Sequence, residues 1–306
     1  MRVLYPHINL AVLCELFGKT RQGWYQWLTR EESTLLYESL IVQLAIDTRG
    51  KINNPKLGTS KLLVLINDEL SSQGVRVGRD KLYGILREKG LLIRHRKRRS
   101  VTTNSVHPYR RYPNLIKNKL IERAEQVWAS DITYLRLAGG FAYLSLITDC
   151  YSRKIVGFCV HPTLSSEGPQ KALLMALSHR YYPRRSLIHH SDQGVQYCSL
   201  DYVRFLKAHD VAISMSSKGS PQENAIAERI NGILKGEYGL DKSFKTMVDV
   251  CKSVEQSISS YNYQRPHRAL DMQTPDQVHQ QEKAEDILQV TTKNRIKRKS
   301  VNLIQE

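Results

Sequence analysis

The spacing of apolar and polar positions divides the chain into an all-helical first part and a later part in which strands and helices alternate. In the first part, apolar residues recur every three or four positions between breaks that contain Gly18, Pro55 and Gly58. This spacing predicts five helices, at 8–17, 20–27, 33–48, 59–70 and 78–89. A short turn joins the last two, so they form a candidate helix-turn-helix.

From residue 121 the pattern changes to short apolar strands separated by turns and helices. Strands are predicted at 126–136, 141–148, 154–161, 186–190 and 211–215. Helices are predicted around Glu228 and at 166–180, 200–209 and 246–261. Three antiparallel strands followed by parallel strands with crossover helices give a mixed α/β sheet. Such a sheet brings the end of the fourth strand beside the first.

Three carboxylates occupy positions that this layout brings together. Asp131 interrupts the first apolar strand, and Asp192 follows the end of the fourth strand. Glu228 lies on a helix, with 35 residues between it and Asp192. An isolated acid is usually a solvated surface group, but acids that rigid elements bring together can share hard divalent cations such as Mg²⁺. Two such cations can clamp the attacking and leaving oxygens of a phosphoryl transfer. We therefore predict a metal-dependent catalytic site here.

Other polar residues nearby have simpler interpretations. Asp149 suits a turn, with a fourth metal ligand as the alternative. Glu223 lies at a helix start, where an acid also interacts favourably with the helix dipole. Glu237 falls on the opposite side of its helix from Glu228. Arg265 is predicted to be structural, closing the C-terminal helix on the core.

The charge of the chain indicates a polyanionic partner. Its formal net charge is +17 and its pI is near 9.7, which favours nucleic acid. Arg79 and Lys81 lie on the helix 78–89, whose basic face is predicted to contact DNA, with a merely solvated face as the alternative. Phosphate contact is also predicted for the basic run that follows, which contains Arg94, Arg96, Lys97, Arg98 and Arg99.

The cysteines and the hydropathy exclude several classes. The five cysteines are scattered without a C-x-x-C pair, which argues against a zinc site and for reduced thiols in a reducing cytoplasm. No run of 18 apolar residues predicts a membrane span, and the N-terminus lacks the small-residue cleavage site of a signal peptide. We therefore expect a cytoplasmic protein that associates with the nucleoid when bound to DNA, and no membrane partner.

Several linked motifs resemble one protein family over nearly the whole chain. The carboxylates lie in VWASDITY (127–134), HSDQG (190–194) and NAIAE (224–228), and the motif YNYQRPH (261–267) follows. These motifs, in this order, resemble bacterial insertion-sequence transposases with a retroviral-integrase-type DDE core. The upstream helix-turn-helix candidate also resembles that family.

The resemblance implies an RNase H-like catalytic core and a site in which Asp131, Asp192 and Glu228 bind two Mg²⁺ or Mn²⁺ ions. It implies cleavage of one strand at each transposon end, after which the freed 3′-hydroxyl attacks another phosphodiester. Lys235 corresponds to a basic residue that contacts DNA near the cleaved end. The implied partners are double-stranded DNA, both transposon ends and target, and further copies of the chain. Because family members are often fused by frameshifting to an upstream segment, a partner protein from an upstream frame is also expected.

These observations predict an RNase H-like α/β core preceded by an all-α module. The expected domains are an N-terminal helical segment that is itself a possible helix-turn-helix (1–50), a helix-turn-helix module (51–99), a basic linker (100–120), the catalytic core with its C-terminal helix (121–282) and a basic tail (283–306). The leading hypothesis is a DNA transposase that cleaves transposon ends and transfers strands. The alternatives are an RNase H-type nuclease and a catalytically inactive DNA-binding regulator derived from a transposase.

Overall fold

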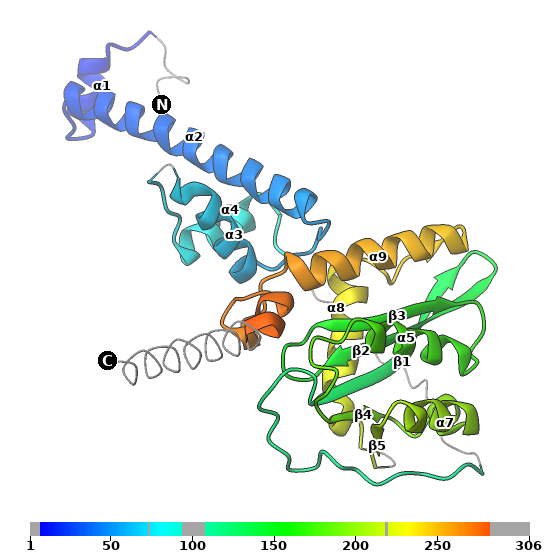
Figure 1. Ribbon diagram of the computed structural model, residues 1–306. Coiled ribbons are helices and arrows are strands. Elements are labelled where there is room, and N and C mark those ends of the chain that lie inside the picture. The colour runs from blue at the N-terminus through cyan, green and yellow to red at the C-terminus, as the bar shows by residue number, and fades with distance from the viewer. Residues whose placement is uncertain (1–6, 73, 94–107, 218–219, 282–306) are drawn as a thin grey trace, which may run out of the picture.

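A computed structural model describes residues 7–72, 74–93, 108–217 and 220–281 of the chain (Figure 1). The predicted basic run at 94–99 and the predicted tail at 283–306 lie outside these residues. The first part is helical, with elements α1 (Leu10–Leu16), α2 (Arg21–Lys51), α3 (Thr59–Ser71) and α4 (Arg79–Glu88).

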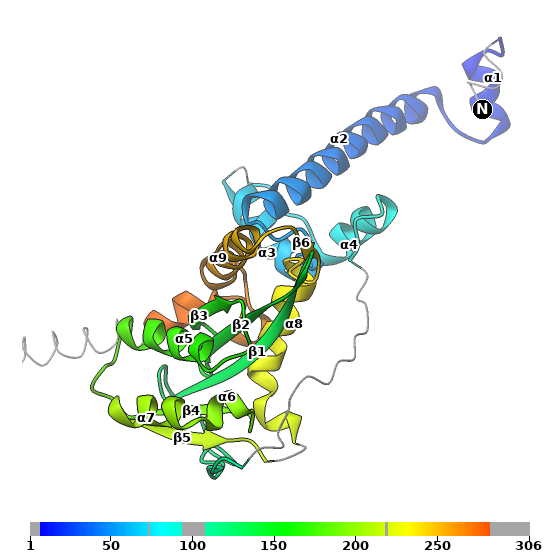
Figure 2. The same ribbon diagram turned by 90° about the vertical axis from the view of Figure 1, so that its right-hand side faces the viewer.

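The helix α2 is a single helix of 31 residues, so the prediction of two separate helices at 20–27 and 33–48 was wrong. Thr20 caps its start as expected, because its side chain accepts a hydrogen bond from the Gly23 N–H at 3.0 Å. The stretch 28–32 between the two predicted helices contains no proline, so every residue in it keeps the N–H group that continues the helix. In both views the first half of α2 extends away from the rest of the chain (Figures 1 and 2).

A compact helical core forms where the second half of α2 meets α3 and α4. Ile41 and Ala45 of α2 pack with Leu62 and Ile66 of α3 and with further apolar residues of α4, and all four are fully buried. This core extends across the predicted domain boundary at residue 50. The helices α3 and α4 are joined by residues 72–78, and the helix-turn-helix interpretation of this pair stays a prediction.

The later part contains the predicted mixed sheet with the order β3-β2-β1-β4-β5. The first three strands are antiparallel, whereas β1, β4 and β5 run parallel to one another. The short β6 pairs with the far end of β1. The strands span Val127–Leu137 (β1), Gly140–Asp149 (β2), Ile155–His161 (β3), Leu187–Ser191 (β4), Val211–Met215 (β5) and Ser243–Phe244 (β6). This arrangement confirms the predicted RNase H-like α/β core preceded by an all-α region.

Helices cover both faces of the sheet (Figure 2). One face carries α5 (Glu167–Ser178), α6 (Val195–Cys198) and α7 (Leu200–Ala208), which share an apolar core with β4 and β5. The other carries α8 (Ala225–Glu237) and α9 (Met247–Tyr263), which share a second core with β1, β2 and β6. Two 3₁₀ turns complete the described elements, η1 (Pro221–Asn224) before α8 and η2 (Arg268–Leu270) after α9.

Candidate active site

The register of two parallel strands brings Asp131 and Asp192 to the same edge of the sheet. Val127 of β1 pairs with Ile188 of β4, and Ala129 pairs with His190. Continuing this register by two residues places Asp192, just after the end of β4, at the level of Asp131. The carboxyl ends of parallel strands are where α/β sheets usually build their sites.

The helix α8 lies across this edge and is attached to β1 by two asparagines. The Asn224 Nδ2 donates to the carbonyl of Ser130 at 3.1 Å, and the Asn231 Nδ2 donates to the Asp131 Oδ2 at 2.8 Å. Asp131 lies on the α8 face because side chains alternate along a strand, and Trp128 and Ser130 on the opposite face pack toward α6.

Backbone amides hold the two aspartates. The Ile132 N–H donates to the Asp131 Oδ1 at 2.9 Å, so both oxygens of that carboxylate accept a hydrogen bond. The Gly194 N–H donates to the Asp192 Oδ1 at 3.0 Å. A Cβ atom at position 194 would lie only 2.9 Å from that oxygen, which gives a physical reason for glycine at this position.

The three carboxylates interact electrostatically. Burial, together with the negative charges of Asp192 and Glu228, raises the pKa of Asp131 to about 7, although the hydrogen bond from Asn231 lowers it. The pKa of Glu228 is also raised, by partial burial and by the charge of Asp192. Concentrated negative charge of this kind is what a bound cation would neutralise.

Carboxylate oxygens are the donors that Mg²⁺ and Mn²⁺ prefer, so the three residues fit a divalent cation in donor type. In the described ranges, however, no three acidic, histidine or cysteine side chains stand close enough together to hold a metal ion as they are. Like charges repel one another, and the Glu228 side chain is exposed and therefore free to change rotamer.

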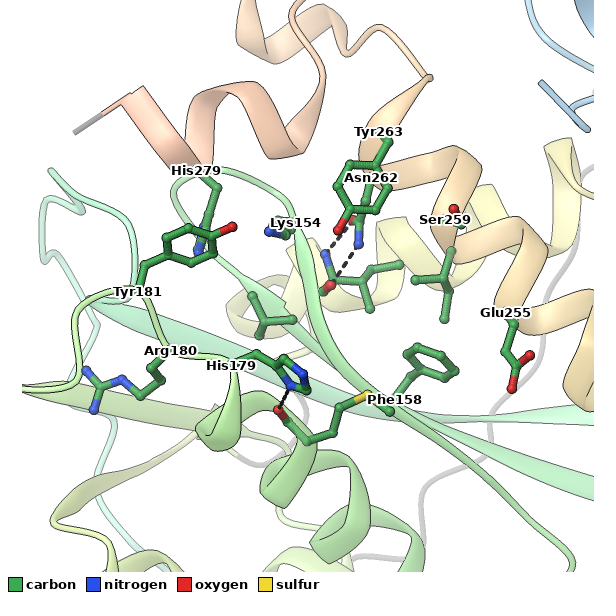
Figure 3. Close-up of a pocket in the computed structure, with 14 residues that line it drawn as sticks. Lys154, Phe158, His179, Arg180, Tyr181, Glu255, Ser259, Asn262, Tyr263 and His279 are labelled. Carbon is green, nitrogen blue, oxygen red and sulfur yellow. Dashed lines mark hydrogen bonds between the residues drawn. The ribbon is translucent and has the colours of Figure 1, made fainter. Parts of the chain in front are cut away.

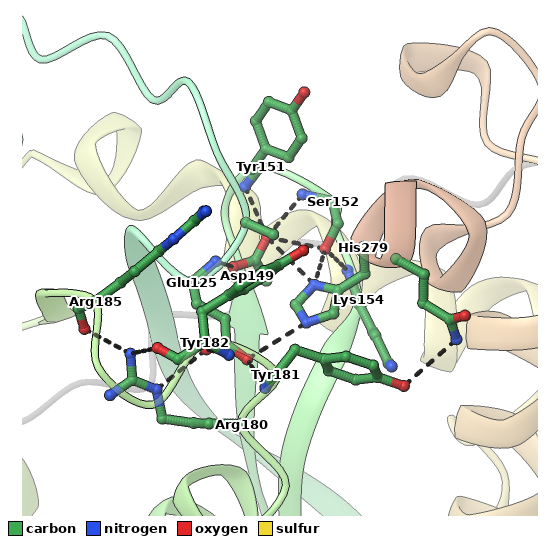
Figure 4. Close-up of polar contacts among 12 residues, drawn as sticks. Glu125, Asp149, Tyr151, Ser152, Lys154, Arg180, Tyr181, Tyr182, Arg185 and His279 are labelled. Atoms are coloured by element: carbon green, nitrogen blue, oxygen red, sulfur yellow. Dashed lines mark hydrogen bonds and ion pairs between the residues drawn. The ribbon is translucent and has the colours of Figure 1, made fainter. Parts of the chain in front are cut away.

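The fourth acid considered, Asp149, is structural (Figure 4). Its Oδ1 accepts hydrogen bonds from the N–H groups of Tyr151 and Ser152, at 3.1 and 2.7 Å, and its Oδ2 accepts from the Glu125 N–H at 2.6 Å. The turn interpretation is therefore confirmed. Burial would raise the pKa of Glu125, but hydrogen bonds, first among them one from His279, outweigh it and lower the pKa. These two acids stabilise the fold around the end of β2.

The side chains of His189 and His190, which precede Asp192, are buried and form hydrogen bonds within the core. The His189 Nε2 lies 2.9 Å from the Tyr202 hydroxyl, and the His190 Nδ1 lies 2.9 Å from the Ser214 hydroxyl. Burial lowers the pKa of His189 to about 3 and also lowers that of His190, so both rings are neutral near pH 7.

The predicted DNA-contact residues within the described ranges lie on helices α4 and α8. Arg79, at the first position of α4, forms an exposed ion pair with Asp80 at 2.9 Å. Lys81, two residues later, pairs with Glu38 of α2. Lys235 lies in the last turn of α8 and is half-buried.

A groove of about 580 Å³ runs along β3 between α5 and α9, but no predicted catalytic residue lines it (Figure 3). On the α9 side, Asn262 bonds both backbone groups of Ile155 at 2.9 Å. Lys154 forms an ion pair with Asp276 at 2.6 Å and lies 5.0 Å from the centre of the Tyr181 ring. The groove therefore belongs to the packing of α9 against the sheet.

The sequence analysis missed Asn231, which contacts the Asp131 carboxylate directly. A signal was present, because Asn231 is a polar residue among Ile230, Ile233 and Leu234 on the buried face of α8. It also follows Glu228 by three positions, which places the two on neighbouring parts of the helix surface.

Comparison with known proteins identifies related sequences. Residues 122–221 and 209–275 each match a family described as an integrase core domain. The chain is 33% identical over 265 residues to the insertion element IS600 uncharacterized 31 kDa protein of Shigella sonnei, covering 86% of this chain and 96% of that protein. It is 32% identical over 237 residues to transposase InsF for insertion sequence IS3A of Escherichia coli strain K12, covering 75% of this chain and 79% of that transposase.

Among solved structures, the catalytic core domain of HTLV-2 integrase in complex with magnesium is similar, with a TM-score of 0.41 and 18% identity. The similarity covers 51% of this chain and 97% of that domain. Among the helices in the described ranges, none combines the length and apolar character needed to cross a membrane.

Proposed function

We propose that Asp131, Asp192 and Glu228 form the catalytic site of this chain, since the chain belongs to the family of bacterial insertion-sequence transposases with an integrase-type core. Members of this family are polynucleotidyl transferases that act on DNA. The observation that carries the proposal is the β1–β4 register. Continued by two residues, this register sets Asp192 beside Asp131, and α8, the helix that contains Glu228, packs against β1 there. The proposed reaction is cleavage of the transposon ends followed by strand transfer.

In this proposal the three carboxylates hold two Mg²⁺ or Mn²⁺ ions, which when bound would activate the attacking oxygen and stabilise the leaving oxygen of a phosphoryl transfer. The chain itself supplies the positioning. Asn231 and the Ile132 N–H fix the rotamer of Asp131, and the Gly194 N–H fixes Asp192. Rigidly held ligands reduce the reorganisation needed when substrate binds.

DNA binding is proposed for the helical module and the basic segments. The helical core spans the end of α2 with α3 and α4, so we propose these elements, together with the rest of the predicted module 51–99, as one DNA-binding unit. Arg79 and Lys81 on α4 would contact phosphates or base edges after exchanging their acidic partners for DNA. Lys235 would contact DNA beside the site, and the segment 94–99 would add phosphate contacts.

The proposed assembly contains more than one copy of the chain, because both ends of a transposon must be cleaved and joined together. A protein from an upstream reading frame is a further proposed partner. Mixing the purified chain with a terminal-repeat duplex and measuring the mass of the complex by light scattering would give the number of copies per DNA end.

The test of catalysis is strand cleavage and joining on a labelled duplex that carries the terminal inverted repeat of the element. The wild type is expected to nick at the repeat end and to join the product to a second duplex with Mg²⁺ but not with EDTA. Asp131→Asn should retain DNA binding and lose cleavage by at least about 10³-fold. The matched control is Asp201→Asn, at an exposed acid in the first turn of α7, which should leave cleavage unchanged.

Two results would contradict the proposal. Cleavage that persists in Asp131→Asn would refute the assignment of the site. Binding without cleavage by the wild type, even when it is fused to the upstream frame, would favour the inactive DNA-binding regulator. Cleavage that appears only in the fused protein would instead establish the upstream segment as a required partner.

A further inference from the structure

The last turn of α8 is tied to the helical module by a buried ionic cluster. The Glu237 carboxylate accepts from Arg265 through two hydrogen bonds, at 2.7 and 2.8 Å. The same carboxylate accepts from the Lys61 Nζ of α3 at 2.8 Å and from the Asn54 Nδ2 at 3.4 Å. The side chains of Lys61 and Glu237 are only 17% and 15% exposed. One carboxylate therefore joins the helical module, α8 and the segment after α9.

A second polar link lies beside this cluster. The Ser260 hydroxyl of α9 donates to the carbonyl of Ile52, at the end of α2, and lies 3.3 Å from the Tyr238 hydroxyl. Tyr238 directly follows Glu237 at the end of α8. Both links thus connect the module to the same end of this helix. We call the two links together the α8 joint.

The joint lies on the helix that carries the proposed catalytic glutamate. Glu228 precedes Glu237 by nine positions on α8, which corresponds to about 14 Å along the helix axis. A helix is stiff over this length, so a shift of its last turn moves the whole element, including Asn231 and its contact with Asp131.

Burying the charge of Lys61 is unfavourable in itself. Burial and the charge of Arg265 lower its pKa, and Glu237 only partly offsets them, because the one carboxylate serves two cations. A buried charge of this kind contributes little net stability, and an apolar side chain of similar size often replaces it without loss. Such groups are kept in some proteins because they specify one arrangement of the elements around them.

We propose that Lys61 is a positioning residue, which acts through Glu237 to set the position of α8, and with it Glu228, when the helical module binds DNA. This inference rests on the proposed function, because it assumes that the module binds DNA and that Glu228 is catalytic. Lys61 touches neither substrate nor reacting atoms. Its effect is transmitted by the contact with Glu237 and by the stiffness of α8.

The test uses the full chain and Lys61→Met, which removes the charge and leaves Glu237 bound by Arg265. Three quantities are measured with the terminal-repeat duplex: the dissociation constant, the single-turnover cleavage rate, and amide hydrogen exchange over 225–237 with and without DNA. We expect the dissociation constant to stay within about twofold and cleavage to slow by about tenfold to a hundredfold. The DNA-dependent protection of 225–237 should disappear.

Two matched variants separate positioning from packing. Lys61→Arg keeps a donor within reach of Glu237 and should restore both the rate and the protection. Lys171→Gln breaks the exposed Lys171–Glu167 pair on α5, outside the helical module, and should change neither. If Lys61→Met does not fold, Lys61→Gln replaces it, because it also removes the charge and leaves Arg265 as the cation bound to Glu237.

The proposal is overturned if Lys61→Met cleaves at the wild-type rate with wild-type protection, or if DNA leaves exchange over 225–237 unchanged in the wild type. Absence of cleavage by the wild type, even when it is fused to the upstream frame, would instead refute the proposed function. The exchange measurement would then still decide whether the joint transmits DNA binding to α8.

Discussion

Replacement of Glu237 by Gln should show how much the buried ionic cluster contributes to stability. The carboxylate of Glu237 accepts hydrogen bonds from two cations, Arg265 and Lys61. Gln has nearly the same shape but no charge, so the variant leaves both cations buried without their counter-ion. Breaking a buried pair in this way is usually strongly destabilising.

The magnitude follows from the pKa of Glu237. Burial would raise this pKa, but the hydrogen bonds and charges of Arg265 and then of Lys61 outweigh burial and lower it from 4.5 to about 2. At about 1.4 kcal/mol per pKa unit, the lowering corresponds to roughly 3 kcal/mol of stability. Because the folded-state pKa lies below the unfolded value, this stability is fully present above about pH 6 and is lost as the pH falls toward 2.

Denaturant unfolding of the wild type and Glu237→Gln, repeated between pH 7 and pH 3.5, measures the effect. The variant should unfold with a free energy lower by about 3 kcal/mol at pH 7, and the difference should narrow to about 2 kcal/mol at pH 3.5. The control Glu69→Gln, at an exposed ion pair, should cost less than about 1 kcal/mol. A difference for Glu237→Gln that is below 1 kcal/mol, or that widens as the pH falls, would refute the reasoning.

Three glycines give further predictions. A Cβ at Gly157 of β3 would lie 2.1 Å from the carbonyl oxygen of Ala172, so Gly157→Ala should lower the free energy of unfolding by about 3 kcal/mol or more. Gly84 of α4 has open space around it, so Gly84→Ala should instead raise the free energy of unfolding by about 1 kcal/mol. Gly194→Ala should slow strand cleavage by about tenfold to a hundredfold at unchanged DNA affinity, because its Cβ would displace the Asp192 carboxylate. Equal cleavage rates for wild type and Gly194→Ala would show that the position of this carboxylate is not limiting.

Most of the candidate site follows from local patterns in the sequence. The alternation around Asp131 marks a half-buried strand, and the apolar run before Asp192 marks the next parallel strand. Since the two strands are parallel neighbours, the end of the short β4 is expected beside β1, the strand that contains Asp131. The observed register, which pairs Ala129 with His190, agrees with this expectation.

Contacts between distant parts of the chain leave no such pattern. Lys61 and Glu237 are separated by 176 positions, and each is an ordinary charged residue on an amphipathic helix when it is considered alone. The continuity of α2 through 28–32 was missed for a related reason. A stretch without apolar periodicity resembles a loop when the local pattern is the only guide, yet this stretch contains no proline, so every residue keeps the N–H group that the helix needs.

The contact of Asn231 with Asp131 joins distant parts of the chain, yet the local sequence contains a signal for it. Burying an amide among Ile230, Ile233 and Leu234 costs free energy unless the amide finds a partner, so a polar residue on an apolar helix face predicts a specific polar contact. The helical spacing from Glu228 limits that contact to groups near the catalytic edge, among which Asp131 is the acceptor. The same rule applied to Lys61 predicts a buried acidic partner but not its identity, because no nearby motif fixes the surface that α3 faces. The partner therefore becomes known only once the helical module is placed against α8.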